Sequence, residues 1–194
     1  SSSAPVGGWC EKHTAAVARA PMGSERSTRA CGPLAGTPVT TLRIGGAHTT
    51  LASGSGPQAR VLRSLPIGAR ATAAVCFSHQ PPTGAELEAA IALVEEAVMP
   101  VRPLLADQST LFTADSGIRQ VAIAAGLQAQ PEMQLTLDAV ERTFERLVAV
   151  SLGQPATHDS LPGDAAFAAT LLILRETMQH LGFAAIVIRS DAVV

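Results

Sequence analysis

The chain has 194 residues, the size of one domain, and its hydrophobic fraction of 47% excludes global disorder. Its net charge of −2 and pI of about 6.2 exclude a strongly basic surface for nucleic acid. No apolar run approaches the ~18 residues of a membrane span. The three cysteines form no Cys-x-x-Cys pair, which favours reduced thiols in the cytoplasm over a disulfide framework.

Residues 1–37 are rich in Gly, Pro and Ser, which predicts a linker or a poorly structured remnant with one short helix over 11–20. The first residues lack the apolar segment of a signal peptide, and the missing initiator Met indicates a fragment or a processed chain. The pattern changes at Pro38, so we expect the folded domain to cover residues 38–194.

Three short strands come first in that domain. They are predicted over residues 39–44, 48–53 and 60–65, where apolar and β-branched residues alternate with polar ones. The turns between them contain Gly45-Gly46 and Gly54-Ser55-Gly56. Short strands joined by glycine-rich turns indicate an antiparallel meander.

A helix is predicted after Thr83, which forms a capping box with Glu86. Pro100 and Pro103 end this helix. The later predicted elements are a strand over 109–113, a helix over 116–125, a helix over 137–148, a helix from Asp164 to Gly182 and a strand over 185–188. The order predicts an α/β fold in which a three-strand antiparallel meander precedes strand–helix crossovers.

The turn after the first strand is the clearest candidate for chemistry. Consecutive glycines remove Cβ atoms, so the backbone N–H groups of Gly45 and Gly46 can approach phosphate oxygens. Hydroxyl groups at Thr49 and Ser116 offer further donors.

The charged and histidine residues elsewhere carry less information. The histidines show no metal-binding spacing, so no metal site is predicted, and His180 is interpreted as a cation at a helix end. Several charged residues are predicted to be solvated on helix faces: Glu95, Glu96, Glu141, Arg142, Glu145 and Arg146.

Six segments in order resemble the second domain of the exopolyphosphatase / guanosine pentaphosphate phosphatase family, of the actin-like ATPase superfamily. The segment Arg43-Ile44-Gly45-Gly46-Ala47-His48-Thr49-Thr50 is similar to the family's Asp-Ile-Gly-Gly-Gly-Ser-Thr-Glu. The other five are Ser64–Gly68, Pro81–Leu87, Leu111–Arg119, Leu135-Thr136, and the stretch from Asp164 to Ser190. The resemblance covers residues 38–191 and implies a ribonuclease-H-like half-domain.

The resemblance also implies the residues of a phosphate site and its chemistry. It assigns phosphate binding to Arg43, Gly45, Gly46, Ala47, His48, Thr49, Ser116 and Gly117. It implies Mg²⁺ as cofactor, polyphosphate or a phosphorylated nucleotide as ligand, and a bacterial source. A catalytic glutamate is expected from a preceding domain, and Glu11 lies at the corresponding place in chain order.

This chain departs from the family pattern where the chemistry is concentrated. Arg43 stands where the family has a metal-associated Asp, and Thr50 where it has Glu. In the second loop Thr113 replaces a glycine, and Asp115 adds a negative charge. The alternatives for Arg43 and His48 are a repurposed anion site and ordinary exposed residues.

Three functions fit these observations. The first is a phosphohydrolase that acts when joined to a preceding domain. The second is a degenerate relative that binds a phosphorylated ligand or a protein without turnover. The third is a structural domain that forms a homodimer. The altered acids favour the second hypothesis over the first.

Overall fold

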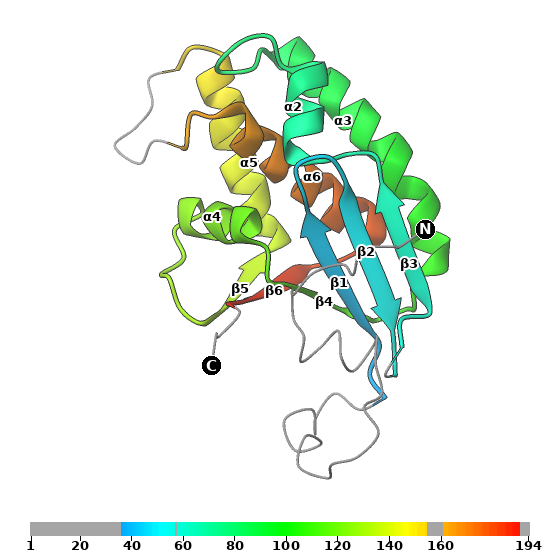
Figure 1. Ribbon diagram of the computed structural model, residues 1–194. Coiled ribbons are helices and arrows are strands. Elements are labelled where there is room, and N and C mark those ends of the chain that lie inside the picture. Colours follow the sequence, from blue (N-terminus) through cyan, green and yellow to red (C-terminus); the bar gives the residue numbers. More distant parts are fainter. Residues whose placement is uncertain (1–35, 57, 155–160, 191–194) are drawn as a thin grey trace.

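The computed structural model describes residues 36–56, 58–154 and 161–190 (Figure 1). Twelve elements follow one another along this part of the chain: β1 (Val39–Ile44), β2 (Thr49–Gly54), β3 (Val61–Leu65), α2 (Ala69–Cys76), α3 (Gly84–Val98), the 3₁₀ helix η1 (Met99–Leu104), β4 (Thr110–Thr113), α4 (Ser116–Ala124), β5 (Glu132–Thr136), α5 (Leu137–Ser151), α6 (Ala165–Leu181) and β6 (Ala185–Arg189). The helix predicted over 11–20 lies outside the described residues, and the proposed boundary at residue 38 stays a prediction.

All six strands form one sheet, in the order β3-β2-β1-β4-β6-β5. The pairs β1–β2 and β2–β3 are antiparallel, which confirms the predicted meander. The pairs β1–β4 and β4–β6 are parallel, so crossovers through helices join them, as predicted. The strand β5 closes the far edge by pairing antiparallel with β6.

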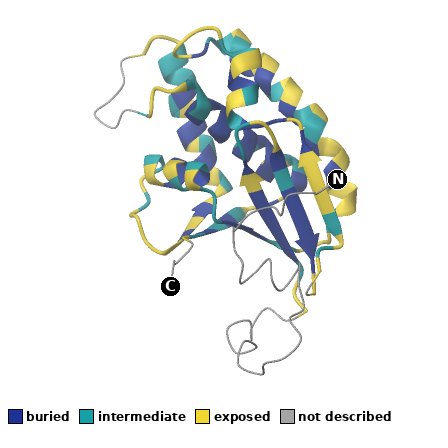
Figure 2. Ribbon diagram, in the orientation of Figure 1, coloured by how far each residue is buried: buried dark blue, intermediate teal, exposed yellow. Residues whose placement is uncertain are grey.

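The helix α6 forms the centre of the molecule. It lies behind β1 and β2 in Figure 1 and packs against α2, α3, α4 and α5. Most of its residues from Phe167 to Leu181 are buried, as expected for a helix that is apolar on nearly every side. Figure 2 shows the same contrast in the sheet, where β1 and β2 are mostly buried and β3 is largely exposed.

The predicted helix ends are confirmed. Thr83 and Glu86 exchange both hydrogen bonds of the capping box at the start of α3. Asp164 caps α6, and Gly182 ends it with a left-handed φ of 79°. These ends depend on short-range hydrogen bonds, which explains why the sequence reveals them.

The predicted element order omits three elements: α2, η1 and β5. The helix α2 has no side chain that caps its start, and its eight residues carry no broad apolar stripe. The strand β5 does alternate, with Met133 and Leu135 buried between exposed neighbours. Its last residues were interpreted only as the opening of the next helix, and Thr136 does cap α5.

The prediction that the helix-face charges are all solvated is wrong for two glutamates and for Arg146, which donates to the carbonyl of Ala124 at 2.7 Å. Glu95 of α3 accepts a hydrogen bond from His180, and Glu141 of α5 accepts one from the Nε of Arg175 at 2.8 Å. Both partners lie on α6, so these pairs join neighbouring helices.

Within the described ranges, no helix is both long and apolar enough to cross a membrane.

Candidate functional site

A cleft of about 580 Å³ opens at the carboxyl ends of the parallel strands β1 and β4. This edge of an open α/β sheet is where ligands commonly bind. The starts of α2, α4 and α6 surround it. Its lining consists of Arg43, Ile44, Gly45, Gly46, Ala69, Ala114, Asp115, Ser116, Gly117, Gln120, Asp164, Ala166, Phe167 and Thr170.

The glycine turn after β1 is held by the start of α2. The Gly45 N–H donates to the carbonyl of His48 at 2.9 Å, which closes the turn. The carbonyl of Gly45 accepts from Ala69 N–H at 2.9 Å, and that of Gly46 accepts from Arg70 N–H at 3.0 Å. The turn therefore supplies the acceptors that the first turn of α2 needs, in place of a side-chain cap.

Two glycines make close approaches at this turn, and the one to backbone atoms, at Gly68, explains why glycine is required there. A Cβ on Gly68 would lie 2.5 Å from the carbonyl carbon of Ala47 and 2.6 Å from the nitrogen of His48. A Cβ on Gly46 would lie 2.6 Å from the guanidinium of Arg70. Arg70 is exposed, so a second arginine lies beside the turn in addition to Arg43.

The loop between β4 and α4 is tied to β1. The Thr113 hydroxyl donates to the carbonyl of Leu42 at 2.7 Å and accepts from Asp115 N–H at 3.0 Å. The threonine that replaces the family's glycine thus has a structural role, because it fixes the entry of α4 against the neighbouring strand.

Asp115 occupies the backbone donors at the start of α4. Its Oδ1 accepts from Gly117 N–H at 2.8 Å and from Ile118 N–H at 3.2 Å. Its Oδ2 accepts from Ile44 N–H at 2.9 Å, at the end of β1. A helix N-terminus attracts anions because its N–H groups are unsatisfied. Here the carboxylate of the chain itself already takes this place.

The charges on the cleft are mixed. Arg43 is exposed at its margin, and Asp115 lies between β1 and α4. Asp164 accepts from Phe167 N–H at 2.7 Å at the start of α6. One arginine and two aspartates therefore line the cleft.

The structure brings together five of the predicted site residues: Arg43, Gly45, Gly46, Ser116 and Gly117. Ser116 is the first residue of α4, which confirms its interpretation as a helix start. Ala47 and His48 are exposed but do not line the cleft. Thr49 is fully buried, so its hydroxyl does not reach the cleft either. Glu11 lies outside the described residues.

The sequence did not reveal the contribution of α6 to the cleft. Asp164 was identified only as a helix cap, and Phe167 only as a core residue; Thr170 was not singled out. All three line the cleft because the start of α6 lies beside that of α4. Packing between helices about 50 residues apart leaves no local signal.

The aspartates of the cleft do not form a Mg²⁺ site as they stand. Both oxygens of Asp115 accept backbone hydrogen bonds, and Asp164 caps α6. Arg43 adds a positive charge where a cation would need a carboxylate. Among the described lining residues, no third acid is present.

Comparisons with known proteins agree with this fold. A model of the Ppx/GppA phosphatase family matches residues 28–194. Comparison with curated proteins gives no match. A solved Ppx/GppA enzyme of Aquifex aeolicus is similar, with a TM-score of 0.63 and 18% identity over 79% of this chain and 53% of that chain. An exopolyphosphatase from Cytophaga hutchinsonii gives 0.63 and 15% over 81% of this chain and 55% of that one.

The chain therefore spans about half the length of these solved structures. At such low identity the likeness shows the fold, and it confirms the actin-like half-domain that the family resemblance implies. The predicted family resemblance is confirmed as well.

Proposed function

Because this chain belongs to the Ppx/GppA phosphatase family, we propose that its cleft binds a phosphate-containing anion without hydrolysing it. The observation that carries binding is Arg43, an exposed arginine on the lining of the cleft. The observation against turnover is Asp115, whose carboxylate accepts the N–H groups of Gly117, Ile118 and Ile44. This carboxylate takes the backbone donors of α4 and repels a phosphoryl group.

Loss of turnover follows from what phosphoanhydride hydrolysis requires. The phosphoryl chain must be held in line, and its developing charge must be offset, usually by a metal ion. Membership of the family is compatible with a Mg²⁺ cofactor. In this cleft, however, both aspartates already accept backbone hydrogen bonds. Arg43, at the end of β1, takes the place of an acid there.

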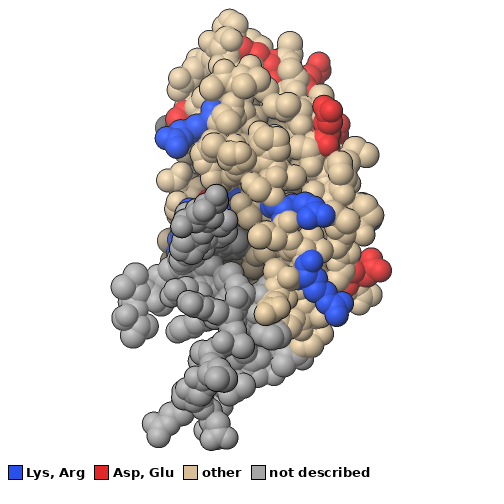
Figure 3. Space-filling view, turned by 45° about the vertical axis from the view of Figure 1, so that its right-hand side comes forward, with Lys and Arg blue, Asp and Glu red and all other residues tan. Residues whose placement is uncertain are grey.

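Binding itself retains two supports. Arg43 is exposed at the margin of the cleft and can contact phosphate oxygens in bidentate geometry. Arg70 lies beside Gly46 on the adjoining side of the turn. On the face shown in Figure 3 the basic residues form small separate groups without a continuous track. Arg43 is the one basic residue among the described residues that line the cleft, so a short oligophosphate or a phosphorylated nucleotide fits this site better than long polyphosphate.

We propose that the protein acts in the cytoplasm, because its three cysteines favour reduced thiols over a disulfide framework. Two other functions remain as alternatives: a hydrolase completed by a preceding domain, and a structural domain that forms a homodimer. Turnover would favour the first, and a dimer that ignores phosphate would favour the second.

The binding proposal is tested with inorganic tripolyphosphate in a calorimetric titration. We expect Arg43→Ala to weaken binding about tenfold, or ~1.4 kcal/mol, because a charge-assisted contact is removed. Arg63→Ala is the matched control, since Arg63 is an exposed arginine of β3 that does not line the cleft. Equal losses in both variants, or no binding by the unmodified chain, would contradict the proposal.

A further inference from the structure

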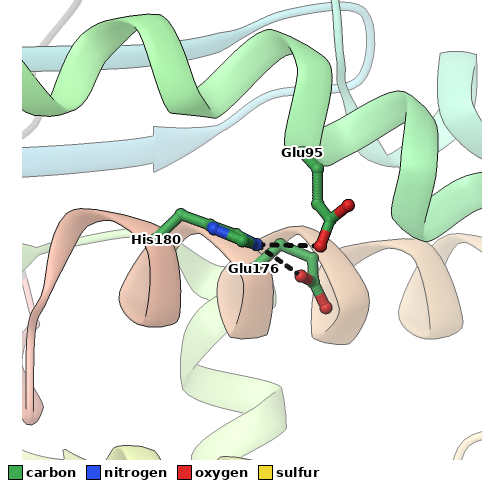
Figure 4. A group of neighbouring side chains, drawn as sticks. All are labelled: Glu95, Glu176 and His180. Atoms are coloured by element: carbon green, nitrogen blue, oxygen red, sulfur yellow. Dashed lines mark hydrogen bonds and ion pairs between the residues drawn. The ribbon is translucent and has the colours of Figure 1, made fainter.

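A histidine and two glutamates converge between α3 and α6, at a site separate from the cleft (Figure 4). The Nε2 atom of His180 lies 3.0 Å from Oε1 of Glu95 and 3.2 Å from Oε2 of Glu176. One ligand atom from each residue lies within 4.8 Å of the other two. The three side chains point toward one another in Figure 4.

The helices fix this arrangement. Glu176 and His180 are four residues apart on α6, so they share one face of that helix. Glu95 reaches them from α3, which packs against α6. The side chain of Glu176 is 1% exposed, whereas those of His180 and Glu95 are 27% and 39% exposed. The group is therefore anchored in the interior and open to solvent on one side.

The charges around this group leave an excess of negative charge. Arg175 donates to Glu141 and to the second oxygen of Glu176, so one guanidinium serves two carboxylates. Glu95 adds a third carboxylate, and the Arg102 guanidinium bonds to the main-chain carbonyl of His180.

The Nε2 atom of the imidazole also has more hydrogen-bond acceptors around it than protons to donate. Two carboxylate oxygens face Nε2, but this atom carries at most one proton. A single N–H shared between two acceptors makes a poor hydrogen bond with each. A cation bound between the Nε2 atom and the two carboxylates would contact both oxygens directly.

Two of the three ligand–ligand distances match those around a tetrahedral ion. Ligand atoms bound at ~2.0–2.1 Å from Zn²⁺ lie about 3.3 Å from one another. The Nε2 atom is already near this separation from both oxygens. A mixed set of imidazole nitrogen and carboxylate oxygen favours zinc and its neighbours over Mg²⁺ or Ca²⁺, which prefer oxygen alone.

We propose that Glu95, Glu176 and His180 bind one divalent transition-metal ion such as Zn²⁺ and link α3 to α6 through it. Three protein ligands leave a fourth position for water. The bond from Arg175 to the other oxygen of Glu176 orients that carboxylate, as groups around metal ligands commonly do. The sequence did not indicate this site, because Glu95 and His180 are 85 positions apart.

The test is a calorimetric titration of the whole chain with Zn²⁺, with bound Co²⁺ as a visible-absorption probe. We expect one strong site per chain and a rise in melting temperature on binding. His180→Ala and Glu95→Gln should each weaken Zn²⁺ binding at least about tenfold. Even residues that only support a metal ligand commonly contribute about 10–100-fold to the affinity. Glu95→Gln keeps the shape of the side chain, so it decides the matter if His180→Ala fails to fold.

His79→Ala is the matched control. His79 is an exposed histidine that contacts one carboxylate, Glu86, so its removal should leave Zn²⁺ affinity and the Co²⁺ spectrum unchanged. The proposal is overturned if the unmodified chain does not bind Zn²⁺. It is also overturned if Glu95→Gln binds as tightly as the unmodified chain, or if His79→Ala removes the site.

Discussion

Two side chains at the cleft, Arg43 and Asp115, set its chemistry. Arg43 brings a positive charge to the end of a strand where the family resemblance implies an acid. Asp115 brings a negative charge to a helix start that would otherwise attract anions. These two charges differ in sign from what the family resemblance implies for a strand end and from what a helix start attracts.

Asp115→Asn removes the negative charge at this position. The amide oxygen can still accept from Gly117 and Ile118 N–H, while the amide NH2 replaces the oxygen that accepts from Ile44 N–H. We expect tripolyphosphate to bind about fivefold more tightly, or ~1 kcal/mol, in calorimetric titration. Asp138→Asn, on the exposed surface of α5, should leave the affinity unchanged. Unchanged or weaker binding by Asp115→Asn would show that this carboxylate does not oppose the anion.

The predictability of single residues from the sequence depended on the range of their interactions. The roles of Thr83, Glu86 and Asp164 as caps were predicted, because each bonds three residues away. The bond from Ile44 to Asp115 joins residues 71 positions apart, and no local pattern encodes it. The sequence therefore predicted the substitutions at the cleft but could not predict that Asp115 occupies the donors.

At the scale of elements, the contact between the glycine turn and α2 positions the cleft. The helix α2 begins on the carbonyls of Gly45 and Gly46, more than twenty residues earlier in the chain. This dependence explains why the sequence did not reveal α2. The neighbouring strands of the meander were predicted within one residue, because their alternation and glycine turns are local signals.

Gly68→Ala tests this contact. The added Cβ would meet backbone atoms of Ala47 and His48 at 2.5–2.6 Å, so the turn or α2 must shift. We expect the free energy of unfolding to fall by about 2–3 kcal/mol, as in overpacked sites, in urea denaturation. Gly84→Ala is the control, since a Cβ there meets nothing within 4 Å at the first residue of α3. A loss of stability in the control equal to that in Gly68→Ala would refute the steric explanation.

The capping box of α3 should respond to acid. Hydrogen bonds from His79 and from the Thr83 backbone lower the pKa of Glu86 to about 2 from 4.5. A carboxyl whose pKa is lower in the folded state stabilises the protein above its unfolded pKa, and this stabilisation is lost as the pH falls toward 2.

Glu86→Gln should therefore reduce the fall in melting temperature between about pH 5 and pH 2, because the amide cannot titrate. The control is Glu88→Gln, an exposed residue of the same helix. The same acid-induced change in Glu86→Gln as in the unmodified chain would contradict this role of Glu86.

At the scale of the whole molecule, the sheet and α6 form the family fold, and the cleft carries one arginine and two aspartates. The buried residues of the strands and α6, from Leu42 to Ile186 in chain order, belong to one hydrophobic core. The fold class was predictable because the order of its elements follows from the local periodicity of apolar residues. The convergence of three helix starts on one cleft depends on tertiary packing, and only the structure reveals it.

Phosphate release from long-chain polyphosphate and guanosine pentaphosphate, measured with Mg²⁺, tests most directly whether this domain has lost its catalysis. The assay should be run on this chain and on the complete gene product, so that a preceding domain can contribute. We predict no release above the buffer rate from either protein, even where tripolyphosphate binds. Steady phosphate release by either one would contradict binding without turnover.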